Sequence, residues 1–266
     1  MNALANPGAM FDVAGKVALI TGASGAFGIV AARVLAAAGC KLALAAGNAG
    51  ALADIAGEVG GALQINARPS DDAACADMVA QTVAAFGRLD ILVVASGMNK
   101  VALIDQMTPE TFATVLDANV MQTWLLARAA TVQMKAQAPH ADGSVGKIVL
   151  VSSARGLLGH PAGYTAYCAS KSAVDGMTRA LGCELGPTGI TVNAIAPTVF
   201  RSPLTAWMFE DTARAAAVRN GFLARVPKGR LGEPEDLAGP LLFLASKASD
   251  FYTGHILYAD GGYTAG

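Results

Sequence analysis

The feature that most constrains this chain is a regular alternation of short apolar runs with longer segments rich in alanine and leucine. The short runs are almost continuously hydrophobic, which is typical of strands covered on both faces by helices. These candidate strands are Val17–Thr21, Lys41–Ala46, Leu63–Asn66, Ile91–Ala95, Lys147–Ser152, Thr191–Ala196 and Ile256–Ala259. The candidate helices between them are Phe27–Ala38, Ala49–Val59, Ser70–Phe86, Pro109–Lys135, Tyr164–Leu185 and Pro234–Leu244. This order predicts an α/β fold, a doubly wound and mostly parallel seven-stranded sheet with helices on both faces.

No boundary between domains is visible. A length of 266 residues suits one large α/β domain, and no Pro/Ser-rich linker or internal repeat divides it. We therefore expect residues 1–266 to form a single domain. The stretch 200–230 lacks a strand pattern and contains Trp207 and Phe222, so we expect a helical excursion that acts as a substrate lid; extra core is the alternative. Ser70 and Thr108, each before an acidic first turn, are expected to cap helices.

Charge and cysteine content exclude several classes of protein. The chain has 19 basic and 20 acidic residues, a net charge of −1, so it lacks the basic excess typical of nucleic-acid binding. The four cysteines are scattered, which argues against a metal site or a disulfide framework and favours a cytoplasmic location. No secretory signal is seen, and charged or polar residues interrupt every apolar stretch, so we expect no membrane span.

A glycine-rich loop follows the first candidate strand, in the order Thr21-Gly22-Ala23-Ser24-Gly25-Ala26-Phe27-Gly28. A strand, a glycine loop and a helix in this order favour dinucleotide binding, because backbone amides and the helix N-terminus can approach a pyrophosphate. A glycine-rich turn without a ligand is the alternative interpretation.

The end of the second candidate strand bears on the choice between NAD and NADP. It reads Ala46-Gly47-Asn48, with neither the acidic residue that holds a ribose 2′-hydroxyl nor an arginine for a 2′-phosphate. Ser24 or Asn48 could hydrogen-bond either cofactor. The small residues leave room for a phosphate, so NADP is favoured while NAD stays open.

Tyr167 and Lys171 lie four residues apart on a predicted helix, which puts the phenol and the ammonium on one face. A tyrosine, with a free pKa of about 10, needs a nearby cation to act as an acid–base at neutral pH, and Lys171 could lower its pKa. Upstream, Ser152 and Ser153 end a predicted strand, where side chains of open α/β sheets meet the ligand crevice. An ordinary exposed Tyr–Lys pair is the alternative.

The ordered set of motifs closely resembles the short-chain dehydrogenase/reductase family, over residues 15–262. The segments that carry the resemblance are TGASGAFG at 21–28, LDILVVASG at 89–97, Asn119-Val120, GKIVLVSS at 146–153, YCASK at 167–171, NAIAPT at 193–198, and GRLGEPEDLAGPLLFLAS and TGHILYADGG near the C-terminus. The resemblance implies a Rossmann fold, an NAD or NADP cofactor and an oxidoreductase acting on a secondary alcohol or ketone.

The resemblance also implies four catalytic residues. Tyr167 would be the general acid/base, and Lys171 would lower its pKa and bind the nicotinamide ribose. Ser153 would hydrogen-bond the reacting oxygen, with Ser152 as the alternative, and Asn119 would hold a water that links Lys171 to solvent.

A larger set of residues would hold the cofactor. It comprises Gly22, Ser24, Gly25, Ala26, Phe27, Gly28, Ala46, Gly47, Asn48, Asn66, Ala67, Ala95, Ser96, Gly97, Tyr167, Lys171, Pro197, Thr198 and Ser202. Three departures from the family pattern stand out. Ala26 replaces a frequent glycine, Val94-Ala95-Ser96-Gly97 replaces Asn-Asn-Ala-Gly, and Asn66 replaces an aspartate that contacts adenine. We expect a slightly altered loop that retains cofactor binding.

The substrate pocket is expected to involve Asn99, Arg155, Tyr164 and Trp207. Within the family, the chain is most similar to sugar-acid and polyol dehydrogenases such as gluconate 5-dehydrogenases. A 3-oxoacyl thioester reductase or another small-ketone reductase is the alternative, and a non-catalytic cofactor-sensing module is a further one. The family also implies a homotetramer, packed through the helices predicted at 109–135 and 164–185.

Overall fold

Seven parallel strands form one sheet in a computed structural model that describes residues 4–266. Its order is β3-β2-β1-β4-β5-β6-β7, and each neighbouring pair runs in the same direction. The strands are β1 (Val17–Thr21), β2 (Lys41–Ala45), β3 (Leu63–Ile65), β4 (Ile91–Val94), β5 (Gly146–Val151), β6 (Ile190–Pro197) and β7 (Ile256–Ala259). The predicted doubly wound α/β fold is confirmed. Residues 1–3 of the predicted domain lie outside the described residues.

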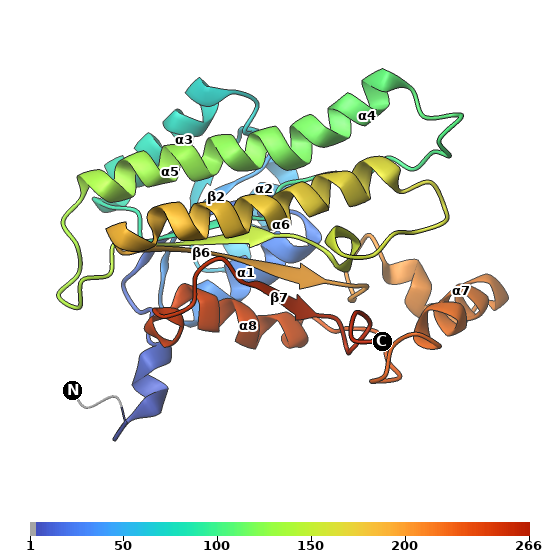
Figure 1. Cartoon of the computed structure of the whole chain (residues 1–266). Helices are drawn as coiled ribbons and strands as arrows, with labels where there is room; N and C mark the ends of the chain where they lie inside the picture. The colour runs from blue at the N-terminus through green and yellow to red at the C-terminus, as the bar shows by residue number, and fades with distance from the viewer. Residues whose placement is uncertain (1–3) are drawn as a thin grey trace.

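Helices connect the strands and cover both faces of the sheet, with α5 and α6 over one face and α8 beneath the other (Figure 1). Leu19 and Ile20, neighbours in β1, are fully buried on opposite faces: Ile20 packs among residues of α1 and α8, and Leu19 among residues of α3 and α5. Both faces of the sheet are therefore core. The helices are α1 (Ala26–Ala37), α2 (Ala49–Glu58), α3 (Asp72–Phe86), α4 (Pro109–Leu116), α5 (Gln122–Ala136), α6 (Thr165–Leu185), α7 (Ala213–Leu223) and α8 (Glu235–Ala245).

Two details of the helices differ from the prediction. The helix expected at Pro109–Lys135 contains a π-helical turn, η2 (Asp117–Met121), which separates α4 from α5. Asp71, not Ser70, caps α3, because its carboxylate accepts a hydrogen bond from the Ala74 nitrogen at 2.8 Å, whereas the Ser70 hydroxyl donates to Asp71. The prediction that Thr108 caps α4 is confirmed.

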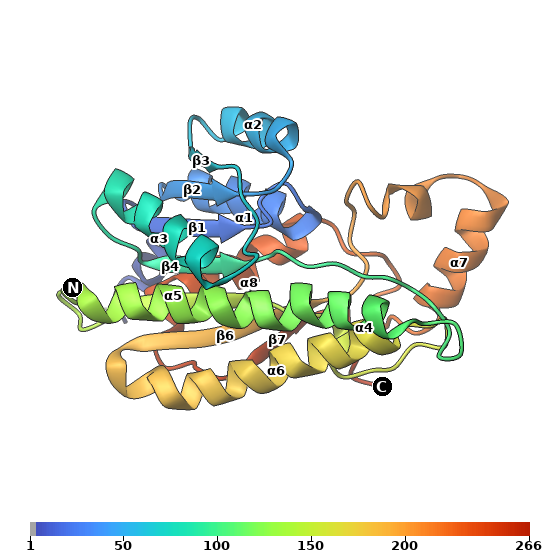
Figure 2. The same cartoon turned by 90° about the horizontal axis from the view of Figure 1, so that it is seen from above.

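The stretch 200–230 forms no strand and contains a 3-10 turn, η5 (Ala206–Phe209), and helix α7. Phe200, at the start of this stretch, forms an isolated β-bridge with Gly232, which follows it. Figures 1 and 2 show α7 beyond the carboxyl ends of β6 and β7, outside the layers that cover the sheet. Met208 is buried there, whereas Trp207 is 39% exposed. In the described part of the chain, no helix is long and apolar enough to cross a membrane.

Candidate active site

The strand order reverses between β1 and β4, and in such sheets a crevice opens at the carboxyl ends of the diverging strands. The glycine loop after β1 borders this crevice. Gly22 has φ of +64°, and a Cβ on it would lie 2.5 Å from the Ser96 nitrogen. A Cβ on Gly28 would collide with the Gly22 carbonyl. Both positions therefore require glycine, because the loop, α1 and the segment after β4 are in close contact.

The amino end of α1 supplies hydrogen-bond donors to this crevice. Gly25 is its N-cap residue and offers no side-chain acceptor to the first amides of the helix. Such unpaired amides, with the positive end of the helix dipole, favour an anionic group. Helix α1 therefore begins as a phosphate-binding helix would.

A first cavity, of about 340 Å³, extends from the glycine loop to the ends of β2 and β3. Asn66 is not among its lining residues; its amide donates to the Ala46 carbonyl at 3.0 Å. Asn48 lines the cavity, but its side-chain oxygen accepts from the Ala51 nitrogen and caps α2. The predicted cofactor residues that line it are Gly22, Ser24, Gly25, Ala46, Gly47, Asn48, Ala67, Ala95, Ser96 and Gly97.

Arg68 lines the same cavity and was not identified from the sequence. Its side chain lies against Gly47, where an added Cβ would collide with it. Within residues 4–266, no carboxylate forms an ion pair with Arg68. Arg68 could have been identified from its position just after β3, because the carboxyl ends of the adjacent parallel strands β2 and β3 meet at one edge of the sheet.

A second cavity, of about 480 Å³, shares Ser24, Gly25, Ala95, Ser96 and Gly97 with the first. Segments that follow β1, β4, β5 and β6 and the first turns of α6 all contribute to its wall. Gly28 packs in α1 and is not part of the lining. The further predicted residues that line it are Ala26, Phe27, Ser153, Tyr167, Lys171, Pro197, Thr198 and Ser202.

Tyr167 and Lys171 lie together on α6, with the Lys171 Nζ 5.6 Å from the centroid of the Tyr167 ring. That Nζ donates to the Val151 carbonyl at 2.8 Å. Burial raises the pKa of Tyr167 above its ordinary value, although hydrogen bonding to Ser153 and the charge of Arg155 act in the opposite direction. Burial also lowers the pKa of Lys171 to about 8. The direction for Tyr167 differs from the one predicted, because the effect of burial outweighs the stabilisation of its phenolate by Ser153 and Arg155.

Asn119 is fully buried in the π-helical turn η2. Its side-chain oxygen accepts from the Met98 nitrogen at 2.8 Å, and its amide donates to the Met98 carbonyl at 2.9 Å and to the Ser170 hydroxyl at 2.8 Å. Single π turns occur frequently at functional sites. This one anchors the segment after β4 to α6, and Asn119 itself does not line either cavity.

The two serines after β5 have different partners. Ser152 donates to the Asp175 carboxylate at 2.5 Å, within the buried layer between β5 and α6. Ser153 hydrogen-bonds the Tyr167 side chain and lines the cavities. The geometry therefore favours Ser153 over Ser152 as the serine that faces a ligand.

A third cavity, of about 610 Å³, lies on the other side of Ser153 and Tyr167, under the 200–230 excursion. All four predicted substrate residues line it: Asn99, Arg155, Tyr164 and Trp207. Two other lining residues, Arg225 and Tyr263, were not identified from the sequence; they come from the excursion and the C-terminal segment. The cavity thus extends from Ser153 and Tyr167 to the excursion.

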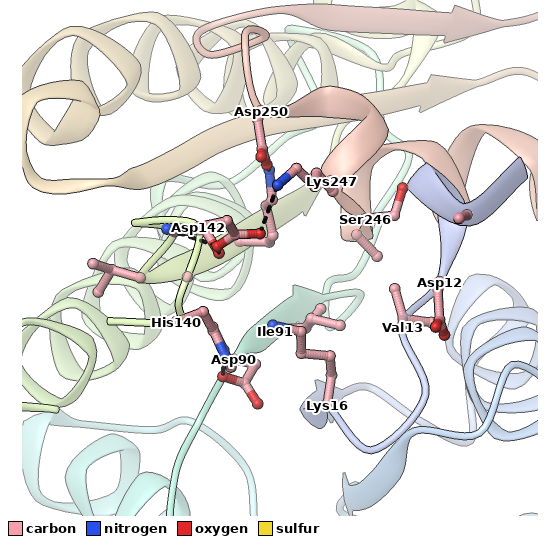
Figure 3. A pocket seen from close by; sticks show the side chains of 16 residues that line it. Asp12, Val13, Lys16, Asp90, Ile91, His140, Asp142, Ser246, Lys247 and Asp250 are labelled. Atoms are coloured by element: carbon pink, nitrogen blue, oxygen red, sulfur yellow. Dashed lines mark hydrogen bonds and ion pairs between the residues drawn. The ribbon is translucent and has the colours of Figure 1, made fainter. Parts of the chain in front are cut away.

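A polar cavity of about 210 Å³ lies at the opposite, amino-terminal end of the sheet (Figure 3). Asp90 and His140 point toward each other there, with 2.7 Å between His140 Nε2 and Asp90 Oδ1. Lys147 pairs with Asp250 and Lys247 with Asp142. Because these charges are paired within the protein, we interpret this cluster as structural.

Residues 4–266 contain no group of three or more His, Cys, Asp or Glu side chains arranged to hold a metal ion. The four cysteines, Cys40, Cys75, Cys168 and Cys183, are free thiols. Burial raises the pKa of Cys40 to about 12 and that of Cys75 to about 11, so neither is a reactive thiolate at neutral pH.

Comparison with known proteins gives consistent matches along the chain. A family model described as enoyl-(acyl carrier protein) reductase matches residues 22–264. An uncharacterized oxidoreductase of Mycobacterium tuberculosis is 49% identical over 259 residues, which cover 97% of this chain and 94% of that protein. A 3-oxoacyl-[acyl-carrier-protein] reductase of Rickettsia bellii is 35% identical, covering 95% of this chain and 98% of its own.

Solved structures agree with these matches. A short-chain type dehydrogenase/reductase from Mycobacterium marinum has a TM-score of 0.87 at 35% identity and covers 97% of this chain and 99% of its own. A putative gluconate dehydrogenase from Agrobacterium tumefaciens has the same TM-score of 0.87 at 28% identity, covering 97% and 99%. The expected similarity to gluconate dehydrogenases is therefore seen in the fold. The sequence of this chain is more similar to that of the 3-oxoacyl reductase, at 35% identity against 28%.

Proposed function

The chain belongs to the short-chain dehydrogenase/reductase family of oxidoreductases, and we propose that it transfers a hydride reversibly between NADP and a small secondary alcohol or ketone, with Tyr167 as the general acid/base. The observation that carries this proposal is the convergence of Ser153, Tyr167 and Lys171 on one cavity that continues into the glycine loop.

The residues present fit the dinucleotide that the family implies. Collision at a Cβ on Gly22 or Gly28 indicates a loop held close enough for backbone amides to reach a pyrophosphate. The first cavity would take the adenosine half and the second the nicotinamide half, near Pro197, Thr198 and Ser202. When bound, the cofactor supplies or accepts the hydride.

The protein's own groups handle the proton. In reduction, the Tyr167 hydroxyl would donate its proton to the substrate oxygen while the Ser153 hydroxyl hydrogen-bonds the same oxygen. In oxidation, the Tyr167 phenolate would accept that proton. Lys171 would stabilise the phenolate and hold the ribose hydroxyls. Asn119 would fix the segment after β4 against α6.

A preference for NADP is supported by Arg68. Its guanidinium lies against Gly47 in the adenosine cavity and has no carboxylate partner among residues 4–266. A planar guanidinium suits bidentate binding of a phosphate oxygen pair. The small side chains at Ala46 and Gly47 leave space for a 2′-phosphate beside it.

Two classes of substrate are each supported by an observation. A sugar acid or polyol is our first proposal, supported by the likeness to a putative gluconate dehydrogenase and by polar lining residues such as Asn99 and Arg155. A 3-oxoacyl thioester is the second, supported by the relative of that activity at 35% identity. A non-catalytic cofactor-sensing role is disfavoured because Ser153, Tyr167 and Lys171 are all present in one cavity.

We also propose that residues 1–266 act as one domain in the cytoplasm, with residues 200–230 as a lid over the substrate. The lid is supported by Trp207 and Met208 at the cavity wall, and the location by free cysteines. A homotetramer is supported by exposed apolar side chains on η2 and α5, where Met121 is 51%, Trp124 43% and Val132 63% exposed.

A substrate panel tests the proposed function. Purified protein is assayed with sugar acids, polyols, cyclic ketones and 3-oxoacyl thioesters, each with NAD(H) and NADP(H), by following nicotinamide absorbance. We expect turnover of one class, faster with NADP(H). Failure to bind either reduced cofactor in a fluorescence titration would refute the proposal.

A further inference from the structure

The substrate cavity carries two arginines and no acidic residue. Arg155 and Arg225 both line it, and none of the lining residues is Asp or Glu. The adjoining nicotinamide cavity also lacks acidic lining residues. The space in front of Tyr167 is therefore electropositive, although the whole chain has a net charge of −1.

Both arginines are organised around Tyr263, which is 2% exposed. Arg155 donates to the Tyr263 hydroxyl at 2.9 Å and to the Gly159 carbonyl at 2.7 Å. The guanidinium carbon of Arg155 lies 5.4 Å from the Tyr263 ring centroid, and that of Arg225 lies 4.6 Å from it. Phe222 stacks on the same ring at 5.0 Å. One buried aromatic ring thus fixes both cations at one end of the cavity.

Three other arginines of the lid region and its flanks have polar partners within the protein. Arg201 pairs with Glu233, Arg230 pairs with Asp236, and Arg219 donates to the Met208 and Glu210 carbonyls. Neither Arg155 nor Arg225 forms an ion pair with any residue in 4–266, although Arg155 donates hydrogen bonds to the Tyr263 hydroxyl and the Gly159 carbonyl. Two cations in a cavity without a counter-charge favour an anionic ligand.

His160 lies close enough to Arg155 and Arg225 for their positive charges to affect its pKa. It lines the cavity beside Tyr164, with ring centroids 4.4 Å apart. Burial lowers its pKa, and the charges of Arg155 and Arg225 lower it further. His160 is therefore kept neutral and does not compete with the two arginines for an anion.

We propose that the substrate carries a carboxylate, bound by Arg225 together with Arg155, while its carbinol or carbonyl carbon lies at Tyr167. This inference rests on the proposed function and narrows it to hydroxy acids and keto acids, over neutral polyols and over thioesters with a neutral acyl chain. Arg225 follows α7, so a bound carboxylate would also tie the lid to the C-terminal segment through Tyr263.

Matched acid and amide substrates test this proposal. Gluconate with gluconamide, and 3-hydroxybutyrate with its amide, are assayed alongside a 3-oxobutyryl thioester of N-acetylcysteamine. We expect kcat/KM for an accepted acid to exceed that for its amide by about 10- to 100-fold, the range for a charge-assisted hydrogen-bond pair. In Arg225→Ala most of this preference is lost, because only Arg155 remains, and Arg225→Lys restores part of it. The control is Arg33→Ala, which removes an exposed arginine that is paired with Glu58 and does not line the cavity.

An equilibrium titration gives a readout that does not need turnover. Cofactor-loaded Tyr167→Phe protein is titrated with the same acids and amides, and the fluorescence of Trp207 at the cavity wall is followed. We expect acids to bind at least tenfold more tightly than amides, and we expect most of this difference to be lost when Arg225→Ala is added.

Specific results would overturn the inference. These are equal affinities for acid and amide, no binding of any acid, or a neutral thioester turned over at a rate that Arg225→Ala leaves unchanged. If neutral substrates are turned over at a rate that depends on Tyr167 but not on Arg225, the proposed function is retained. The proposal that the substrate carries a carboxylate is then rejected. Failure of the unmodified protein to bind either cofactor would refute the proposed oxidoreductase function itself.

Discussion

Tyr167 and Lys171 are each perturbed by burial, in opposite directions. The pKa of Tyr167 is raised and that of Lys171 is lowered to about 8. Reduction needs the neutral phenol, which persists at neutral pH, and oxidation needs the phenolate, which forms only at higher pH. The direction of catalysis should therefore respond strongly to pH.

The first prediction concerns this pH dependence. In the reductive direction, kcat/KM should be level below about pH 8 and fall above it, as the Lys171 ammonium loses its proton. Alcohol oxidation should be faster in alkaline than in neutral solution. Profiles of kcat/KM in both directions measure this. Lys171→Met should lower kcat/KM at every pH and remove the change near pH 8; a reductive rate that rises through pH 8 would contradict the assignment.

The second prediction concerns Arg68. Replacing Arg68 with alanine should weaken NADPH binding by about 10- to 100-fold, because a charge-assisted phosphate contact is lost, and should change NADH binding by less than about threefold. Fluorescence titration measures both dissociation constants. Arg33→Ala, which removes an exposed arginine paired with Glu58 away from the cavities, is the control. An equal loss for both cofactors would argue against a 2′-phosphate contact.

Some strands and helices can be predicted from the sequence more accurately than others. The apolar run of β1 defines its bounds, because a strand buried between helices leaves little room for polar residues. The bounds of β7 also match its apolar run, although this edge strand is partly exposed. The cap of α3 was misplaced, since adjacent Ser70 and Asp71 are both good acceptors and only the loop geometry selects between them. The π turn at η2 and the approach of Arg68 to Gly47 depend on contacts between distant segments, which local patterns do not encode.

The third prediction concerns the amino end of the sheet. Asp90 is 3% exposed, and its carboxylate accepts from the Val17 nitrogen at 2.9 Å, Arg88 at 2.7 Å and His140 at 2.7 Å. Asp90→Ala leaves these donors unpaired and should cost about 3 kcal/mol. Thermal melts at fixed protein concentration should show a Tm about 8 °C lower, with cofactor affinity unchanged. Lys247→Ala, which breaks an exposed pair with Asp142, should shift the Tm much less.

The effect of Asp90 should also depend on pH. Burial alone would raise the pKa of Asp90, but hydrogen bonds from Val17, His140 and Arg88 lower it below the ordinary value. Its stabilising contribution is therefore present above the unfolded pKa of about 4 and is lost as the pH falls through the folded pKa. The difference in Tm between the native protein and Asp90→Ala should shrink below about pH 4. A constant difference down to pH 2 would contradict this account.

At the scale of the whole molecule, α5 and α6 lie side by side on one outer face (Figures 1 and 2). Exposed Trp124 and Val132 on α5 give this face apolar character, and α6 carries the proposed catalytic pair, Tyr167 and Lys171. Packing of copies through this face would bury the exposed side chains and stiffen the helix that positions Tyr167.

The fourth prediction is the oligomeric state. Light scattering should give a mass near four times the 26.8-kDa chain. The double variant Trp124→Glu/Val132→Glu should give a smaller particle with reduced kcat, whereas Phe11→Glu, at an exposed residue of the N-terminal turn η1 (Pro7–Phe11), should remain a tetramer. A monomer at micromolar concentration would contradict the tetramer.

The central claim is that the Tyr167 hydroxyl transfers the proton, while the other residues of the cofactor-binding set provide most of the affinity for the cofactor. The most direct measurement is kcat for the accepted substrate in Tyr167→Phe, taken with the NADPH dissociation constant of the same variant. The account predicts that kcat falls about 10²- to 10⁴-fold, because the acid/base is lost, while the dissociation constant changes less than about twofold. A Tyr167→Phe enzyme with the activity of the unmodified protein would contradict it.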